Sequence, residues 1–165
     1  MVKLNVREIL ESKGLLCEWD FEKNIKLGYT PCNVTLYSHK KIWWRCSLNH
    51  EWQDTLEHRV LREDSCPYCS GHRVLTGFND LATTSPELLC EWDFDKNNEL
   101  GYFPENFSAG SRRKVWWKCS VCKNSWQAPI KDRSRGRGCS ICSGRIIIAG
   151  YNDFASNYPH LMKEW

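Results

Sequence analysis

The sequence contains no apolar run long enough to cross a membrane. Only 41% of its 165 residues are apolar, the mean hydropathy is -0.58, and no stretch approaches the roughly 20 apolar residues of a membrane span. The start, MVKLNVREILESKG, lacks the long apolar segment and small-residue cleavage site of a secretory signal. We therefore expect no membrane partner and a cytoplasmic location.

The chain instead repeats itself at a spacing of 73 residues. The EWDF of residues 18–21 returns at 91–94, and the tryptophan pair at 43–44 returns at 116–117. The register continues into the last residues, so a third copy begins before residue 165. This pattern predicts a helical lead-in over residues 1–17, one repeat over 18–90, and a second over 91–165 that includes the start of the third copy. A chain cut from a longer repeat protein would end in this way.

Neither repeat has much apolar material for a core, so each needs a covalent or metal staple to offset its conformational entropy. Ten cysteines are available. As disulfides they would indicate an extracellular protein, which the missing signal argues against. We therefore expect a reducing compartment and thiolates bound to metal.

The second repeat carries two CxxC motifs, Cys119–Cys122 and Cys139–Cys142. Each motif turns two sulfurs toward one point, and the pair completes a tetrahedron around zinc. In the first repeat Cys66 and Cys69 form the second motif, whereas the first offers only Cys46 and, four residues later, His50. Imidazole replaces thiolate at structural zinc, which makes His50 the predicted fourth ligand.

His58 and His72 are alternatives to His50 as the fourth ligand in the first repeat. Cys17, Cys32 and Cys90 then remain outside the sites, and we expect Cys17 and Cys90 to be small packing residues. Both sites have four protein ligands and no open position for water, so we predict two structural Zn²⁺ ions per chain. Without zinc each repeat should unfold.

The expected fold is small α+β, with tandem zinc-ribbon or treble-clef-like units. β-Branched and aromatic residues predict a strand over 41–46 and its repeat 114–119, with return strands over 50–56 and 126–130. Residues 77–92 indicate a short capped helix and a second turn that joins the repeats. Residues 24–38 and 97–111 are predicted loops.

These motifs carry a family resemblance. EWD, LGY-x-P, WW-x-C, HEW, and CPYCSG followed by GFNDLATTSPEL resemble the repeating probable zinc-ribbon domain of bacterial and phage proteins, a domain of unknown function. Members sometimes accompany endonuclease domains of the very-short-patch-repair type, so the resemblance implies a module associated with nucleic acid. The chain departs from the family pattern at Cys122, which replaces the histidine of HEW. It departs again where residues 61–65 of the first repeat stand against the arginine-rich 133–138 of the second.

Charge is distributed unevenly between the repeats. Residues 18–90 contain 8 basic and 10 acidic side chains, a net charge of -2, whereas residues 91–163 contain 12 and 7, a net charge of +5. This basic surface predicts contacts with polynucleotide phosphates, DNA more than RNA. The expected contact residues are Arg112, Arg113, Lys114, Lys118, Lys131, Arg133, Arg135 and Arg137. A merely solvated loop is the alternative, because the pI of 8.3 lies below the value above 9 typical of basic nucleic-acid domains.

Three other functional hypotheses follow from single features. The outward tryptophan of each strand pair could stack on an unpaired base, although packing is the more common fate in a small domain. A protein adaptor is the main alternative to nucleic-acid binding. A small treble-clef nuclease would need a histidine motif that His39, His58 and His72 do not form, so we expect no enzyme and no small-molecule substrate.

Overall fold

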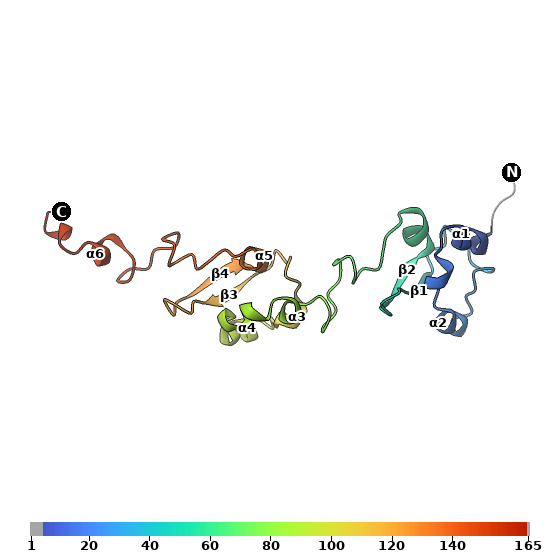
Figure 1. The fold of residues 1–165 in the computed structure, drawn as a ribbon, viewed down its shortest axis with the longest axis horizontal. Helices are drawn as coiled ribbons and strands as arrows, with labels where there is room; N and C mark the ends of the chain where they lie inside the picture. Colours follow the sequence, from blue (N-terminus) through green and yellow to red (C-terminus); the bar gives the residue numbers. More distant parts are fainter. Residues whose placement is uncertain (1–4, 165) are drawn as a thin grey trace. The chain divides into compact units, whose positions relative to one another are not determined.

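The computed structural model describes residues 5–164, and the chain divides into two compact units, Met1–Arg73 and Val74–Trp165 (Figure 1). The unit boundary precedes the repeat boundary predicted at residue 90, because the intervening segment packs within the second unit. The amide of Leu81 donates to the Phe107 carbonyl at 2.6 Å. No helix within residues 5–164 is long and apolar enough to span a bilayer.

Each unit is built on one antiparallel hairpin (Figure 1). In the first unit β1 (Lys41–Arg45) pairs with β2 (Glu51–Thr55), and in the second β3 (Lys114–Lys118) pairs with β4 (Ser125–Pro129). Successive strand side chains alternate between faces, so one residue of each tryptophan pair points into the core. The predicted strands and their pairing are confirmed.

Short helices surround both hairpins. The first unit contains α1 (Val6–Ser12), the 3₁₀ turn η1 (Leu16–Glu18), α2 (Phe21–Lys26) and the π turn η2 (Glu57–Leu61). The second contains α3 (Leu81–Thr84), η3 (Pro86–Glu91), α4 (Phe94–Glu99), η4 (Pro104–Asn106), α5 (Ile130–Ser134), α6 (Phe154–Asn157) and η5 (Leu161–Lys163). The helical lead-in is thus present as α1, with Asn5 and Glu8 forming a capping box.

The predicted loop at 24–38 begins later than expected, because α2 extends to Lys26. Asp20 caps this helix by accepting from the Lys23 amide at 3.0 Å. Asn24 then fixes the helix to the hairpin, since its side chain donates to the Trp43 carbonyl and accepts from the Trp43 amide, at 2.8 and 2.9 Å. Asn97 makes the same two bonds to Trp116 in the second unit. These buried asparagines set the distance between helix and strand.

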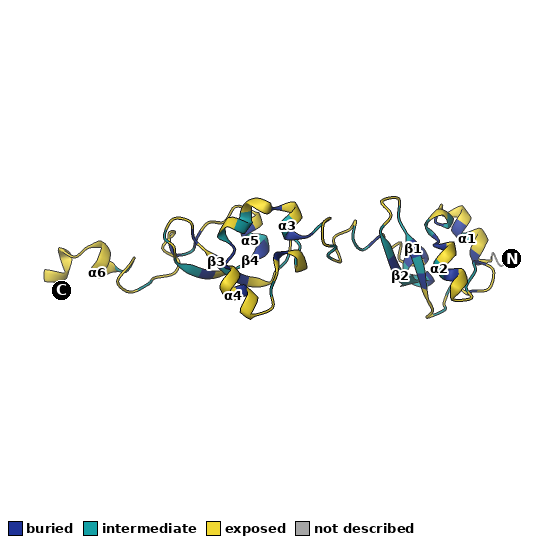
Figure 2. Cartoon of the chain, turned by 90° about the horizontal axis from the view of Figure 1, so that it is seen from below, coloured by how far each residue is buried: buried dark blue, intermediate teal, exposed yellow. Residues whose placement is uncertain are grey.

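The core of each unit centres on two tryptophans in an edge-to-face contact. The ring centroids of Trp19 and Trp44 lie 5.7 Å apart, and those of Trp92 and Trp117 lie 5.5 Å apart. Aliphatic residues from the elements before and after the hairpin close each core. Residues 150–164, which repeat 77–91 and which we call the third-copy segment, contribute no residue to either core. Figure 2 shows α6 exposed along its length, and Phe154 is 47% exposed whereas its repeat equivalent Leu81 is 0% exposed.

Candidate metal centres

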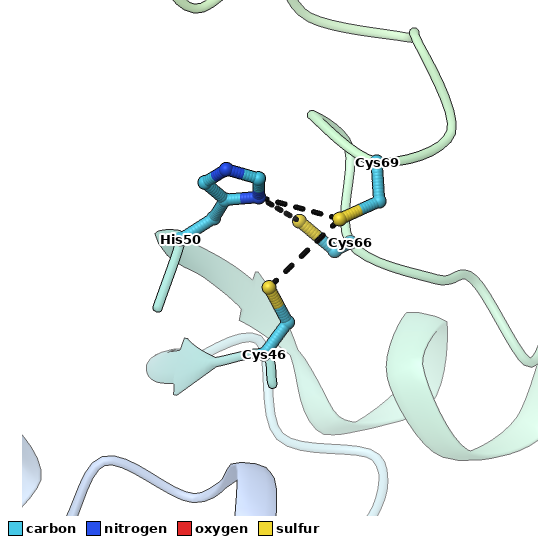
Figure 3. A group of neighbouring side chains, drawn as sticks. All are labelled: Cys46, His50, Cys66 and Cys69. Carbon is cyan, nitrogen blue, oxygen red and sulfur yellow. Dashed lines mark hydrogen bonds between the residues drawn. The ribbon is translucent and has the colours of Figure 1, made fainter. Parts of the chain in front are cut away.

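Four side chains converge at the tip of the first hairpin (Figure 3). Cys46 follows β1 and His50 precedes β2, while Cys66 and Cys69 lie on the turn after η2. The Nδ1 of His50 lies 3.3 Å from the Sγ of Cys69 and 3.8 Å from that of Cys66. We call each pair of ligands that lie close in the sequence a knuckle. In the first knuckle of this site Asn49 adopts a φ of 61°, the left-handed conformation that the turn requires and that asparagine tolerates.

The second unit brings four sulfurs together in the same way. The Sγ atoms of Cys119 and Cys142 lie 3.7 Å apart, and those of Cys122 and Cys139 lie 3.8 Å apart. In each knuckle the amide of the second cysteine points at the sulfur of the first, with N to Sγ distances of 3.5 Å. An N–H directed at sulfur stabilises the thiolate form.

These spacings fit a tetrahedral ion. A tetrahedron with zinc–sulfur bonds of about 2.3 Å has edges of about 3.8 Å, and the sulfur pairs across both sites lie 3.7 to 3.9 Å apart. Thiolate and imidazole are the ligands that zinc prefers in structural sites. All four positions are occupied by protein atoms, so the donor sets suit structural zinc.

The acid–base properties of the thiols also call for a cation. Hydrogen bonding to Cys122 and burial raise the pKa of Cys142 to about 12. Burial also opposes ionisation of Cys122, yet the Asn124 amide and the neighbouring thiols lower the pKa of Cys122 to about 7. Four adjacent thiols cannot all carry negative charge without compensation, and a divalent ion supplies it.

The structure excludes the alternative fourth ligands of the first site. His58 lies instead beside two carboxylates, with its Nδ1 2.8 Å from Asp54 Oδ1 and Asp64 close by. His72 lies 2.8 Å from the Ser70 hydroxyl. His50 therefore completes the first site, as predicted.

The remaining cysteines are exposed, so the packing role predicted for Cys17 and Cys90 is wrong. Both occupy short 3₁₀ turns, in which the Sγ atoms lie 3.2 and 3.0 Å from the carbonyls of Gly14 and Glu87. The 3₁₀ turns that carry Cys17 and Cys90 point these side chains to solvent, even though the tryptophan and aspartate of the following EWD motif are buried. Cys32 is exposed as well.

Arg133 is not a surface residue, which corrects its predicted role as a phosphate contact. It is 9% exposed, pairs with the Glu91 carboxylate and stacks 5.4 Å from the rings of Trp117 and Trp126. Its counterpart is Arg59, whose Nη2 lies 2.7 Å from Glu18. A partly buried glutamate paired with a buried arginine is therefore part of both units.

The correspondence between Arg59 and Arg133 reveals a compensated shift in register. The distance from the first cysteine to the β2 or β4 tryptophan is six residues in the first unit and seven in the second. The distance from the buried arginine to the next cysteine is seven and six. Comparing the repeats at a constant offset of 73 residues hides this shift. The signal that reveals it is the pairing of an arginine before the second knuckle with the glutamate of EWD.

Six members of the predicted basic set are exposed on the second unit, namely Arg112, Arg113, Lys114, Lys118, Arg135 and Arg137. Lys131 is half-buried. The outward tryptophans are covered from α2 and α4, because Lys23 and Lys96 lie 4.4 and 4.3 Å from the ring centroids of Trp43 and Trp116. These rings pack within their own units, and the stacking hypothesis has no support in the structure.

Paired knuckles that place four ligands beside a hairpin define a tandem array of structural zinc fingers, with two zinc sites per chain. The chain belongs to the family of the probable treble clef zinc finger domain, whose model matches residues 15–72 and 88–145. The resemblance seen in the sequence is thereby confirmed, with treble clef as the subtype. No curated protein matches the chain.

Proposed function

We propose that the second unit binds the phosphate backbone of nucleic acid, DNA in preference to RNA. The observation that carries this proposal is the charge difference between two units of the same fold, -2 over residues 18–90 and +5 over 91–163. With zinc bound the two net charges become -3 and +3, because the Cys₃His site contributes a formal -1 and the Cys₄ site -2. A unit that stays positive attracts polyanions, whereas its neighbour repels them.

Exposure of the basic side chains supports this proposal. Arg112 and Arg113 precede β3, Lys114 and Lys118 occupy its two ends, and Arg135 follows α5. Side chains of this kind contact phosphate without reading sequence. The expected binding is therefore sensitive to salt and tolerant of sequence.

A binding role, not a catalytic one, suits the donor sets of the two sites. Each zinc has four protein ligands, and a catalytic zinc keeps one position for water or substrate. We propose that both ions act in folding alone. Loss of either ion then affects binding only through the unit that unfolds.

A protein partner is the second candidate, favoured by the apolar side chains of the third-copy segment. Phe154, Tyr158, Leu161 and Met162 are all exposed. Exposed aromatic and methionine side chains are typical of the centres of protein interfaces. Such binding would persist at high salt, which separates it from binding to phosphates.

The test is fluorescence anisotropy of labelled single- and double-stranded DNA and RNA, at about 50 and 200 mM salt, with zinc measured in the same samples. We expect affinity that falls steeply with salt. Replacing Arg112, Arg113 and Arg135 together by alanine should weaken binding more than tenfold at low salt while zinc content stays at two. The matched control replaces exposed Lys40, Lys41 and Arg62 of the first unit and should change affinity less than threefold. Equal effects of the two triple variants would contradict the proposal.

A further inference from the structure

A small pocket in the second unit gathers basic side chains from three segments of the chain. It has a volume of about 240 Å³ and lies between the hairpin and the second knuckle. Its rim includes Lys114, Asp132, Arg137, Gly138, Ser140 and Arg145. We call this the basic pocket. Arg145 follows the second knuckle and was not among the predicted contact residues.

We propose that the basic pocket holds one phosphate group of the bound nucleic acid, an inference that rests on the proposed function. Lys114, Arg137 and Arg145 are exposed, and only Arg137 has an anionic partner, Asp132 at 3.2 Å. Within residues 5–164 no carboxylate forms an ion pair with Lys114 or Arg145. The rim therefore carries uncompensated positive charge.

The size and chemistry of the pocket select a phosphate over larger ligands. Pockets for drug-sized ligands measure about 300–1,000 Å³, and about 240 Å³ is below that range. The lining offers guanidinium and ammonium donors together with the Ser140 hydroxyl, and Gly138 leaves backbone accessible. Arginine forms paired hydrogen bonds with phosphate oxygens, a geometry that lysine does not provide.

The first unit contains the equivalent pocket with the opposite charge. Its volume is about 320 Å³, and its lining includes Asp54, Asp64 and His72 with one cation, Arg73, so the two carboxylates leave it net negative. The correspondence follows from shared hydrogen bonds, because the carbonyls of Asp64 and Arg137 accept from the buried arginine of their own units. The second knuckles are 73 residues apart, which places His72 at the position of Arg145.

Three substitutions therefore change the charge of one pocket within the same fold, and the first is His72 in the place of Arg145. Asp64 stands where the second unit has Arg137, and Asp54 stands where it has Ala128, since the strand partners of Ile42 and Val115 are Asp54 and Ala128. Phosphate is repelled from the first pocket and attracted to the second. The chain thus anchors a polynucleotide at one phosphate site in the second unit.

The decisive variant is Arg145→Ala in the full chain, compared with Lys163→Ala, which removes an exposed cation of the second unit outside both the pocket lining and the proposed contact residues. We expect R145A to weaken oligonucleotide binding about tenfold at low salt and to reduce the salt slope by about one. K163A should change affinity less than threefold. Both variants should retain two zinc ions and the wild-type circular dichroism spectrum.

A second variant adds the pocket to the first unit. Asp64→Arg with His72→Arg should increase the affinity for the same oligonucleotide and raise the salt slope by about one or two. If the wild type binds and R145A equals K163A, the pocket inference is wrong and the proposed function stands. If the wild type binds no oligonucleotide, the proposed function fails and this inference fails with it.

Discussion

The two units have the same interior and different surfaces. Each contains an edge-to-face tryptophan pair, an asparagine that bonds both backbone groups of a strand residue, and a partly buried glutamate paired with a buried arginine. The outer positions diverge, so that aspartates in the first unit correspond to Ala128 and Arg137 in the second. The shared residues determine the fold, whereas the divergent ones determine what each unit attracts.

The comparison also assigns roles to residues of the same type. Arg133 and Arg137 are four residues apart in one arginine-rich stretch. Arg133 is buried against tryptophan rings in both hairpin strands, and Arg137 is exposed beside a pocket. The first unit retains an arginine at the buried position and an aspartate at the exposed one. A charge that both units keep at an equivalent position is therefore structural, whereas a charge that differs between them is a candidate for binding.

The strongest test of the comparison removes one zinc at a time. Cys66→Ser should leave one zinc per chain and unfold the first unit alone, and Cys139→Ser should do the same to the second, because structural zinc contributes about 10–16 kcal/mol of binding free energy. Zinc analysis with amide NMR spectra would show which half of the resonances collapses. Collapse of both halves in either variant would show that the units do not fold independently.

The next largest effect concerns the ion pairs of the two buried arginines. Arg59→Ala and Arg133→Ala should each lower the unfolding free energy of their unit by about 3–5 kcal/mol, because truncation leaves a carboxylate poorly solvated. Arg62→Ala is the matched control, since its pair with Glu57 is exposed and worth at most about 1 kcal/mol. Denaturant unfolding with saturating zinc measures all three. A small loss of unfolding free energy in R133A would contradict the structural role of Arg133 and favour its predicted role as a phosphate contact.

The smallest effect compares two aspartate helix caps. Asp80 caps α3 and is 0% exposed, whereas Asp153 caps the exposed α6. Asp80→Ala should cost about 1–2 kcal/mol, and Asp153→Ala should leave the unfolding free energy of the second unit nearly unchanged. A comparable loss in both variants would show that α6 belongs to the cooperative unit.

The Asp80 contribution should also depend on pH. Burial raises the pKa of Asp80, but hydrogen bonds from Thr83 and the Gly77 amide outweigh it, so the pKa falls below its ordinary value. Because the folded-state pKa is lower than the unfolded value of about 3.9, this stabilisation is present above about pH 4 and is lost as the pH falls through the folded-state pKa. Acid also releases zinc from both proteins. The difference between the pH–stability curves of wild type and D80A therefore measures the contribution of Asp80 alone.

The sequence predicted the ligands and strands well because their signals are local. Paired cysteines at fixed spacing and β-branched aromatic strands need no knowledge of distant residues. The buried role of Arg133 depends on Glu91, 42 residues away, and the cover over Trp116 comes from Lys96 on another element. Such contacts have no local signature. The exposure of Cys17 and Cys90 was missed for the same reason, since burial is decided by the packing of the turns that carry them.

The compensated shift in register makes the stretch from Cys46 to Cys66 and that from Cys119 to Cys139 equal in length, at 21 residues each. Each stretch starts and ends on a zinc ligand and carries the first pair of ligands, the return strand of the hairpin and the buried arginine. The two stretches are therefore interchangeable in length. A chain in which they are exchanged would keep the position of every downstream residue. Ligand type and surface charge could be recombined between repeats without rebuilding either scaffold.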